Sequence, residues 1–331
     1  MNLVTGSTGI VGIHVMLALL RRGEEVKALC RKTSDRQTVA DVFAHYGAAD
    51  LYPKIVWAEG DLLDRQSLVE ALQDVDTVYH AAAVVSFCKK DRKAMWAANV
   101  EGTANMVDAA IASGVGAFCH VSSIGALGKA MGGGIVTEDT PWQVDDRRSV
   151  YSQSKFRQEM EVWRGAENGL NVVVVNPGVV LGPGRKGRSS ALIAQTMKRG
   201  TSFYTDGATG YVDARDVAQA MVELTAQKLY GQRFVVVGHN SETRTVQTLF
   251  AEAFGKKPPY RKASRNMLYL AAFAAKTAAF FTGSRPALTY ESVRAIGGHQ
   301  KYSSEKLTNA IGLKFMSLED SVRNMASFYM K

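Results

Sequence analysis

The chain has 331 residues, 46% of them hydrophobic, which is enough to bury the core of one large domain or two modest ones. Its formal net charge of +9 arises in residues 255–331, which leaves three explanations open: a solvated basic surface, an anionic substrate or an anionic membrane surface. No basic run is interleaved with aromatic residues, so no nucleic-acid partner is expected.

The first half of the chain alternates short apolar strands with helical stretches, starting with a strand at Leu3–Thr5 and a helix at Val11–Arg22. Further strands are expected at Glu25–Cys30, Ile55–Glu59, Thr77–Ala81 and Ala117–Ser122, and helices at Arg65–Gln73, Arg92–Ser113 and from Tyr151 to about Trp163. The strand Asn171–Asn176 has four valines in a row, as is typical of a parallel strand covered on both faces. This alternation predicts an α/β fold with a doubly wound parallel sheet, the Rossmann architecture.

After Pro177 the alternation of strands and helices loosens. A helix after Asp213 and a strand at Gln232–Gly238 are expected to return to the sheet. We therefore predict a dinucleotide-binding domain over 1–178 plus 211–239, and a smaller, mainly helical substrate-binding region over 179–210 plus 240–331.

One segment, Met267–Gly283, is rich in alanine and apolar residues. A helix that spans a bilayer needs roughly 20 apolar residues and disfavours a central charge such as Lys276. We expect a buried or pocket-lining helix. Superficial membrane contact is the alternative, favoured by the flanking Arg261, Lys262 and Arg265.

A glycine-rich loop, TGSTGIVG, lies between the first strand and the first helix. Gly6 allows a tight turn, Gly9 lets the backbone approach a pyrophosphate, and Gly12 permits close packing of the helix. Free N–H groups at the start of the helix attract phosphates. We assign this loop, including Thr8, to dinucleotide binding.

The end of the second strand selects the cofactor. An acid there would bind the ribose hydroxyls and repel a 2′-phosphate, but this chain has Cys30, Arg31 and Lys32. Arg31 offers a planar fork to a phosphate and Lys32 a point charge. NADP(H) is therefore preferred, with NAD(H) possible; the alternative is two ordinary surface cations.

Two further segments suit the adenine and the sugars of a dinucleotide. Asp61, after the third strand, can accept hydrogen bonds from the adenine amino group, and Leu62 can cover the ring, whereas Asp64 fits better as a helix cap. Small side chains at Ala81, Ala82 and Ala83 allow the backbone to contact the sugars of the cofactor. His80 is expected to be structural.

Tyr151 and Lys155 stand one helical turn apart in YSQSK, and Ser122 and Ser123 end the fifth strand. An ammonium about 4 Å from a phenol, at an effective dielectric near 20, favours the phenolate by roughly 4 kcal/mol, on the order of three pKa units. Tyr151 would then exchange a proton with a substrate oxygen, and a serine hydroxyl would polarise that oxygen. Lys155 can also bind the nicotinamide ribose.

The three cysteines, Cys30, Cys88 and Cys119, are far apart in apolar runs and indicate buried reduced thiols and no metal site. The first strand runs straight into the glycine loop and leaves no room for a signal peptide, so a cytoplasmic enzyme is expected.

The motifs TGSTGIVG, GDLLD, HAAA, AANVEGT, VSS, YSQSK and NPGVVLGPG occur in the order found in extended short-chain dehydrogenases/reductases, the NAD-dependent epimerase/dehydratase superfamily. The chain most resembles its dihydroflavonol 4-reductase, 3β-hydroxysteroid dehydrogenase and hopanoid-associated epimerase-like members. This resemblance implies that the active hydroxyl is Ser123 and that Asn99 helps to anchor the lysine through water.

The resemblance also implies that Ile10 and Val11 flank the pyrophosphate, and that the backbone at Pro177 and Val180 meets the nicotinamide carboxamide. Asp213 and Asp216 would be structural. Family members often form homodimers through the two long helices, here Arg92–Ser113 and the helix that carries Tyr151.

The substrate is expected to be a small, apolar or aromatic carbonyl compound or alcohol, because the segments expected to face it carry few fixed charges. These segments are Val84–Phe87, Ile124–Leu127, Leu181 and Phe203–Tyr211. We expect an NADPH-dependent oxidoreductase. The alternatives are a nucleotide-sugar epimerase or dehydratase with tightly bound NAD, and a non-catalytic NADP-binding regulatory protein.

Overall fold

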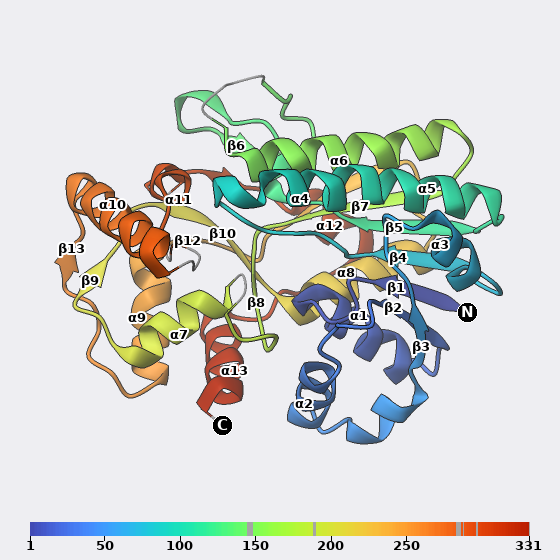
Figure 1. The fold of residues 1–331 in the computed structure, drawn as a ribbon, viewed down its shortest axis with the longest axis horizontal. Helices are drawn as coiled ribbons and strands as arrows, with labels where there is room; N and C mark the ends of the chain where they lie inside the picture. The colour runs from blue at the N-terminus through green and yellow to red at the C-terminus, as the bar shows by residue number, and fades with distance from the viewer. Residues whose placement is uncertain (144–147, 188–189, 283–285, 287, 296, 331) are drawn as a thin grey trace.

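A seven-stranded parallel sheet forms the centre of the protein (Figure 1). The computed structural model describes all residues except 144–147, 188–189, 283–285, 287, 296 and 331. The strand order is β11-β7-β5-β4-β1-β2-β3. These strands are β1 (Asn2–Thr5), β2 (Val26–Cys30), β3 (Val56–Glu59), β4 (Thr77–His80), β5 (Ala117–Val121), β7 (Val172–Pro177) and β11 (Gln232–Val236). The predicted doubly wound α/β fold is confirmed.

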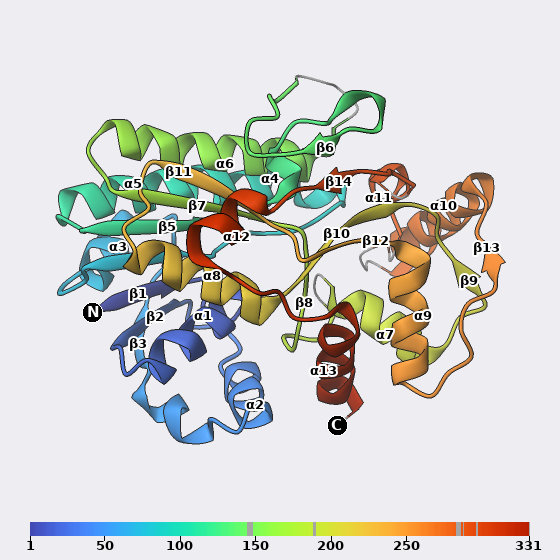
Figure 2. The ribbon, with the colours of Figure 1, turned by 180° about the vertical axis from the view of Figure 1, so that it is seen from behind.

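Helices cover both faces of this sheet, as the opposite views in Figures 1 and 2 show. One face packs on α1 (Ile10–Arg21), α2 (Gln37–His45) and α8 (Ala214–Ala226), the other on α3 (Arg65–Ala71), α5 (Gly102–Ala112) and α6 (Val150–Glu167). In β7, Val173 and Val175 enter the first core, while Val172 and Val174 enter the second. The run of four valines therefore reflects a strand buried on both sides.

The long helix expected at Arg92–Ser113 is interrupted. Helix α4 (Arg92–Trp96) passes into a π-helical turn at Ala97–Glu101, and α5 follows directly. The turn contains the fully buried Asn99. Single π turns inside helices are frequent at functional sites, because the extra residue changes the direction of nearby side chains.

Several elements had no clear signal in the sequence, because strands of two to six residues pair with segments far away in the chain. A three-stranded sheet joins β8 (Val179–Leu181), β10 (Ala208–Asp213) and β12 (His239–Glu242). Two-stranded pairs join β9 (Phe203–Tyr204) to β13 (Arg261–Lys262) and β6 (Ile135–Val136) to β14 (Lys301–Tyr302).

The C-terminal part is mainly helical. Its core lies between α7 (Ala191–Arg199), α9 (Thr243–Ala253) and α13 (Leu318–Met330), with Phe250, Met325 and Tyr329 buried there. The remaining helices are α10 (Arg265–Thr282), α11 (Tyr290–Ala295) and α12 (Glu305–Ile311). As expected, α8 packs on the main sheet and β11 pairs with β7. The division into two domains stays a prediction.

The expectation that Met267–Gly283 forms a buried helix is wrong for most of its length, and the alternative of a pocket-lining helix stays a prediction. Gly283 itself lies outside the described residues. In α10 the side chains of Leu270, Phe273 and Phe281 are 69%, 60% and 81% exposed, whereas Ala272 and Ala279 are buried. The inward face carries alanines, so the larger apolar side chains point to solvent. Among the described residues, no helix has the length and apolar character needed to cross a bilayer.

Two carboxylates fix α8, in agreement with their expected structural role. Asp213 caps the helix by accepting a hydrogen bond from the Arg215 backbone N–H (2.8 Å) and pairs with its guanidinium (2.7 Å). Asp216 accepts a hydrogen bond from the Met316 backbone N–H (2.9 Å), which ties α8 to the C-terminal part. Burial raises the pKa of Asp216 to about 7, and the negative charge of Asp213 adds to this shift.

We predict that Asp216→Asn stabilises the protein more at pH 8 than at pH 5. The folded state binds the Asp216 proton more tightly than the unfolded state, so stability falls as the pH rises from about 4 to about 7. The amide of the substituted side chain can still accept the hydrogen bond from the Met316 N–H. Because it does not ionise, it avoids the cost of burying a negative charge. The difference between the two pH values should be on the order of 1–2 kcal/mol in urea unfolding.

The exposed Asp50→Asn serves as the control and should change stability equally at both pH values. An Asp216→Asn effect that is the same at pH 5 and pH 8 would contradict the linkage.

Candidate active site

The glycine loop has a backbone that only glycine allows at two positions. Gly6 has a φ of 63°, and a Cβ there would lie 2.6 Å from the Ala81 carbonyl oxygen. A Cβ on Gly12 would lie 2.3 Å from the Gly6 carbonyl oxygen. The Gly9 N–H donates to this same oxygen (2.8 Å) and closes the turn. The loop therefore lies tightly against the end of β4.

The N-terminus of α1 faces this loop without a side-chain cap. Gly9 is the N-cap, and the first helical hydrogen bond runs from the Ile13 N–H to the Gly9 carbonyl (2.9 Å). The N–H groups of Ile10, Val11 and Gly12 precede it, at the positive end of the helix. Together with the half-buried Thr8, they fit the pyrophosphate of a dinucleotide.

Arg31 and Lys32 are exposed directly after β2, as binding to a 2′-phosphate requires. A tight turn fixes them, because the Ser34 N–H donates to the Arg31 carbonyl (2.8 Å) and the Ser34 Oγ accepts from the Arg31 N–H (3.1 Å).

Sequence reasoning missed a third cation beside these two. The guanidinium of Arg36 lies 4.7 Å from the centre of the Trp57 ring and donates to the Cys30 Sγ (3.3 Å). Arg36 lies two residues after Ser34, and the turn directs it back to the strand end.

The residues expected to bind the adenine and the ribose are less accessible than expected. One carboxylate oxygen of Asp61 accepts a hydrogen bond from the Leu63 N–H (3.0 Å), and Leu62 packs against Gly102 of α5. Asp64 caps α3, as predicted. After β4, Ala81 and Ala82 are half-buried and Ala83 is exposed.

Ser123 and Tyr151 lie side by side. A Cβ on Gly125 would lie 3.3 Å from the Ser123 Oγ and 3.7 Å from the Tyr151 ring. Burial raises the pKa of Tyr151, and its hydrogen bond with Ser123 offsets part of that rise. Ser122 turns away and donates to the buried Glu159 carboxylate (2.5 Å), which agrees with its expected structural role.

Lys155 makes hydrogen bonds to groups other than Tyr151, and its expected effect on the pKa of the phenol stays a prediction. Its side chain is 1% exposed, and its Nζ donates to the Val121 carbonyl (2.8 Å) and to the Gln158 Oε1 (2.5 Å). Burial lowers the pKa of Lys155 to about 7, although Glu159 acts in the opposite direction.

A buried hydrogen-bonded path connects Lys155 to the strand that precedes the glycine loop. The Gln158 Nε2 donates to the Thr103 Oγ1 (2.8 Å) and to the Ala82 carbonyl (3.2 Å). His80 bonds Thr103 and Thr5 through its two ring nitrogens (2.8 Å each). Burial lowers the pKa of His80 to about 3, so it stays neutral and structural, as expected. Gln158 and Thr103 carried no motif and were missed.

Asn99 fixes the loop beside the tyrosine. Its amide exchanges two hydrogen bonds with the Val84 backbone (2.7 and 3.0 Å) and donates to the Ser154 Oγ (3.1 Å). Its water link to Lys155 stays a prediction. Phe87, at the end of the same loop, has its ring 5.9 Å from the ring of Tyr151. An aromatic side chain therefore borders the candidate proton donor.

Other residues expected near the substrate lie elsewhere. Leu127 is buried with Val136, Val235 and Val237, and Leu181 is buried in the C-terminal core, so both expectations are wrong. Both fill gaps between elements that are distant in sequence. Pro177 is buried in β7, and the Val180 carbonyl accepts a hydrogen bond from the Ser190 Oγ (2.5 Å).

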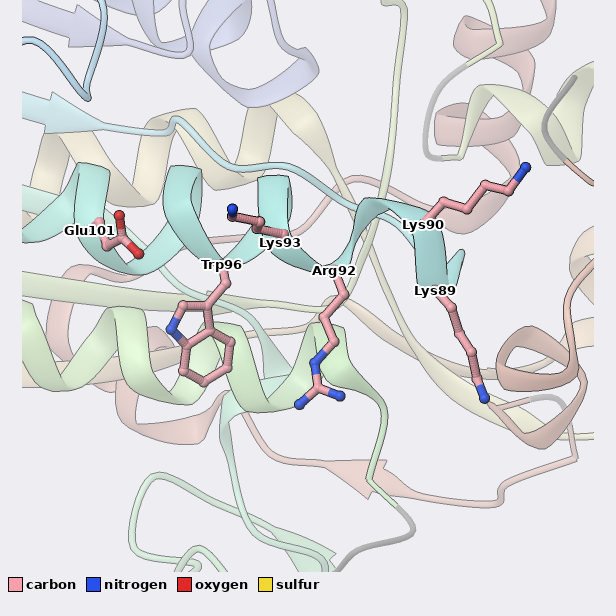
Figure 3. Close-up of a pocket in the computed structure, with 6 residues that line it drawn as sticks. All are labelled: Lys89, Lys90, Arg92, Lys93, Trp96 and Glu101. Atoms are coloured by element: carbon pink, nitrogen blue, oxygen red, sulfur yellow. The ribbon is translucent and has the colours of Figure 1, made fainter. Parts of the chain in front are cut away.

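A basic surface hollow lies along α4 (Figure 3). It is lined by Lys89, Lys90, Arg92, Lys93, Trp96 and Glu101. Figure 3 shows Lys89 and Lys90 pointing apart and Lys93 directed away from Arg92. The cations do not converge on one point, and the hollow shares no lining residue with Ser123, Tyr151 and Lys155.

Residues 2–238 match the model of the NAD dependent epimerase/dehydratase family. The chain is 30% identical to sterol demethylase protein B of Methylococcus capsulatus, over 94% of this chain and 93% of that protein. It is also 30% identical to cinnamoyl-CoA reductase 1 of Petunia hybrida, over 67% of each chain.

Solved structures share the fold over the whole length. That of gox2253 has a TM-score of 0.81 and 28% identity, and covers 100% of this chain and 98% of its own. UDP-glucuronic acid 4-epimerase from Bacillus cereus, solved with UDP-glucuronic acid and NAD, has a TM-score of 0.76 at 18% identity, covering 99% and 98%.

We predict that Gln158→Leu lowers the free energy of unfolding by about 1–3 kcal/mol, because the buried Thr103 hydroxyl and Lys155 amine each lose a partner. Chemical denaturation measures this change. The exposed Gln66→Leu is the matched control and should change stability by less than about 0.5 kcal/mol. Equal effects of the two substitutions would show that the path contributes nothing.

Proposed function

Because the chain belongs to the NAD-dependent epimerase/dehydratase family, we propose that it is an NADPH-dependent oxidoreductase that reduces the carbonyl group of a small, apolar or aromatic substrate. The observation that carries this proposal is the pairing of Ser123 with Tyr151 beside the Lys155 that follows one turn later in α6. The glycine loop and Arg31 supply the cofactor side. When bound, the cofactor provides the hydride.

The protein contributes the proton and the orientation. The Ser123 hydroxyl and the Tyr151 phenol together hold the substrate oxygen, and the phenol gives its proton to that oxygen as charge develops. Burial keeps Tyr151 protonated at neutral pH, which suits an acid. Near pH 7 the phenol is therefore present in the protonated form that carbonyl reduction requires.

Lys155 has a binding role in this proposal. Its amine lies at the carboxyl end of β5, on the Val121 carbonyl, and Gln158 connects it to the Ala82 carbonyl. Ligands of open α/β sheets bind at the carboxyl ends of the strands. We assign Lys155 to the nicotinamide ribose hydroxyls, with Asn99 holding the neighbouring loop.

Simple reduction is favoured over epimerisation or dehydration by two features of the sequence. No acid ends β2, where enzymes that retain NAD commonly carry one, and Ile124 and Gly125 follow Ser123, where dehydratases place an acidic pair. Phe87 against Tyr151 gives the site an aromatic wall. Relatives named as a cinnamoyl-CoA reductase and a sterol demethylase protein support an aromatic or apolar substrate class.

Tyr151→Phe should reduce carbonyl-dependent NADPH oxidation by about two to four orders of magnitude, because the substrate oxygen loses its proton donor. The measurement uses a panel of aromatic, steroid-like and short aliphatic aldehydes and ketones. Tyr230→Phe, just before the amino end of β11 and therefore at the edge of the sheet opposite the site, should leave the rate unchanged. Wild-type turnover by Tyr151→Phe, or copurified NAD with turnover without added cofactor, would refute the proposal.

Arg31→Ser/Lys32→Ser should raise KM for NADPH by about ten- to a hundredfold and leave KM for NADH nearly constant, since charge-assisted bonds to a 2′-phosphate are lost. Steady-state kinetics with both coenzymes measure this. Lys54→Ser removes an exposed cation at a remote turn and should change neither constant. An equal rise for both coenzymes would contradict phosphate recognition at β2.

A further inference from the structure

Helix α10 presents an apolar stripe to solvent. At 3.6 residues per turn, Leu270, Phe273 and Phe281 fall within about 80° of one another around the helix axis. Their exposed fractions of 69%, 60% and 81% include the two largest among the exposed large hydrophobic residues. Single apolar side chains scattered over a surface are normal, but several large ones exposed on the same face of one helix are typical of an interaction site.

The stripe is not the face through which α10 packs on the rest of the protein. The opposite face of α10 already packs inward through Ala272 (1% exposed) and Ala279 (5% exposed), and Tyr269 stacks on Tyr290 of α11. Figures 1 and 2 both place α10 at the end of the molecule opposite β3. The helix is thus held by one face and offers the other outward.

The surroundings of the stripe are strongly basic. Residues 255–294 contain eight Lys or Arg and a single acid, Glu291. Arg265 and Lys276 on α10 and Arg261 on β13 are exposed, whereas Lys262 is paired with Asp206 (2.7 Å). Lys276 falls about 60° around the helix from Phe273, so its long side chain can reach outward beside the stripe.

We propose that α10 docks on a lipid bilayer with anionic headgroups, parallel to the surface, with Leu270, Phe273 and Phe281 in the interfacial layer and Arg261, Arg265 and Lys276 on the headgroups. The stripe from Leu270 to Phe281 is about 16 Å long, which suits a surface-bound helix. Anionic headgroups attract such clustered cations. A second copy of this chain would bring like charges together, so a bilayer is favoured.

Binding can be measured by sedimentation of the full chain with vesicles of phosphatidylcholine and phosphatidylglycerol at about 3:1, and with phosphatidylcholine alone. The proposal predicts binding to the anionic vesicles that falls steeply with salt. Phe273→Ser/Phe281→Ser should weaken binding by about tenfold or more, because two aromatic side chains leave the interfacial layer. Arg265→Glu/Lys276→Glu should weaken it on the order of tenfold.

Matched controls separate the local surface from general properties. Val56→Ser/Val69→Ser removes two side chains that are each 48% exposed, at the far end of the molecule. Lys54→Glu/Lys89→Glu makes the same net-charge change on exposed residues elsewhere. Both variants should bind anionic vesicles like the wild type, and circular dichroism should show that all variants are folded.

Three outcomes would overturn the proposal. The first is no sedimentation with anionic vesicles, and the second is equal loss of binding in the control variants. The third is a concentration-dependent dimer, measured by light scattering, that Phe273→Ser/Phe281→Ser abolishes, since a second copy would then cover the stripe. The experiment uses no substrate, so it is independent of the proposed reductase activity.

Discussion

The buried hydrogen-bonded path from Lys155 to Thr5 is the constraint on which the candidate site depends. It runs from the lysine amine through Gln158, Thr103 and His80 to the end of β1. Each member is buried, so an unpaired group in it would cost stability. The path fixes α5 and α6 against β4, where the glycine loop makes its closest approach. The strand before the glycine loop and the helix that carries Tyr151 are thereby joined by one hydrogen-bonded path.

The same burial changes how the site would work. The spacing of Tyr151 and Lys155 suggested that the ammonium would draw the phenol towards ionisation. In the folded protein the amine is held by Val121 and Gln158, and desolvation raises the pKa of Tyr151 while it lowers that of Lys155. A protonated phenol beside Ser123 suits proton donation. The lysine is then better placed for binding at the carboxyl end of β5.

Much of the fold and site followed from local patterns. The run of four valines predicted β7, and Gly6 and Gly12 predicted the tight glycine loop. Asp64 was predicted to cap a helix, and it caps α3. The failures share a cause, since they depended on contacts between distant segments. Leu127 and Leu181 were expected to face the substrate but fill cores, and the apolar α10 was expected to be buried but turns its largest side chains outward. Apolar character indicates that a side chain tends to be covered. It does not indicate which segment of the chain or which partner covers it.

The sequence by itself determined the doubly wound sheet, the position of the glycine loop and the order of Ser123, Tyr151 and Lys155, because periodicity and backbone sterics act over a few residues. Only the tertiary structure decided where the Lys155 amine points, how Gln158 and Thr103 complete its surroundings, and that Arg36 stacks on Trp57. It also decided which face of α10 meets solvent. Desolvation and hydrogen-bond partners arise from packing between segments far apart in the chain, so no local pattern encodes them.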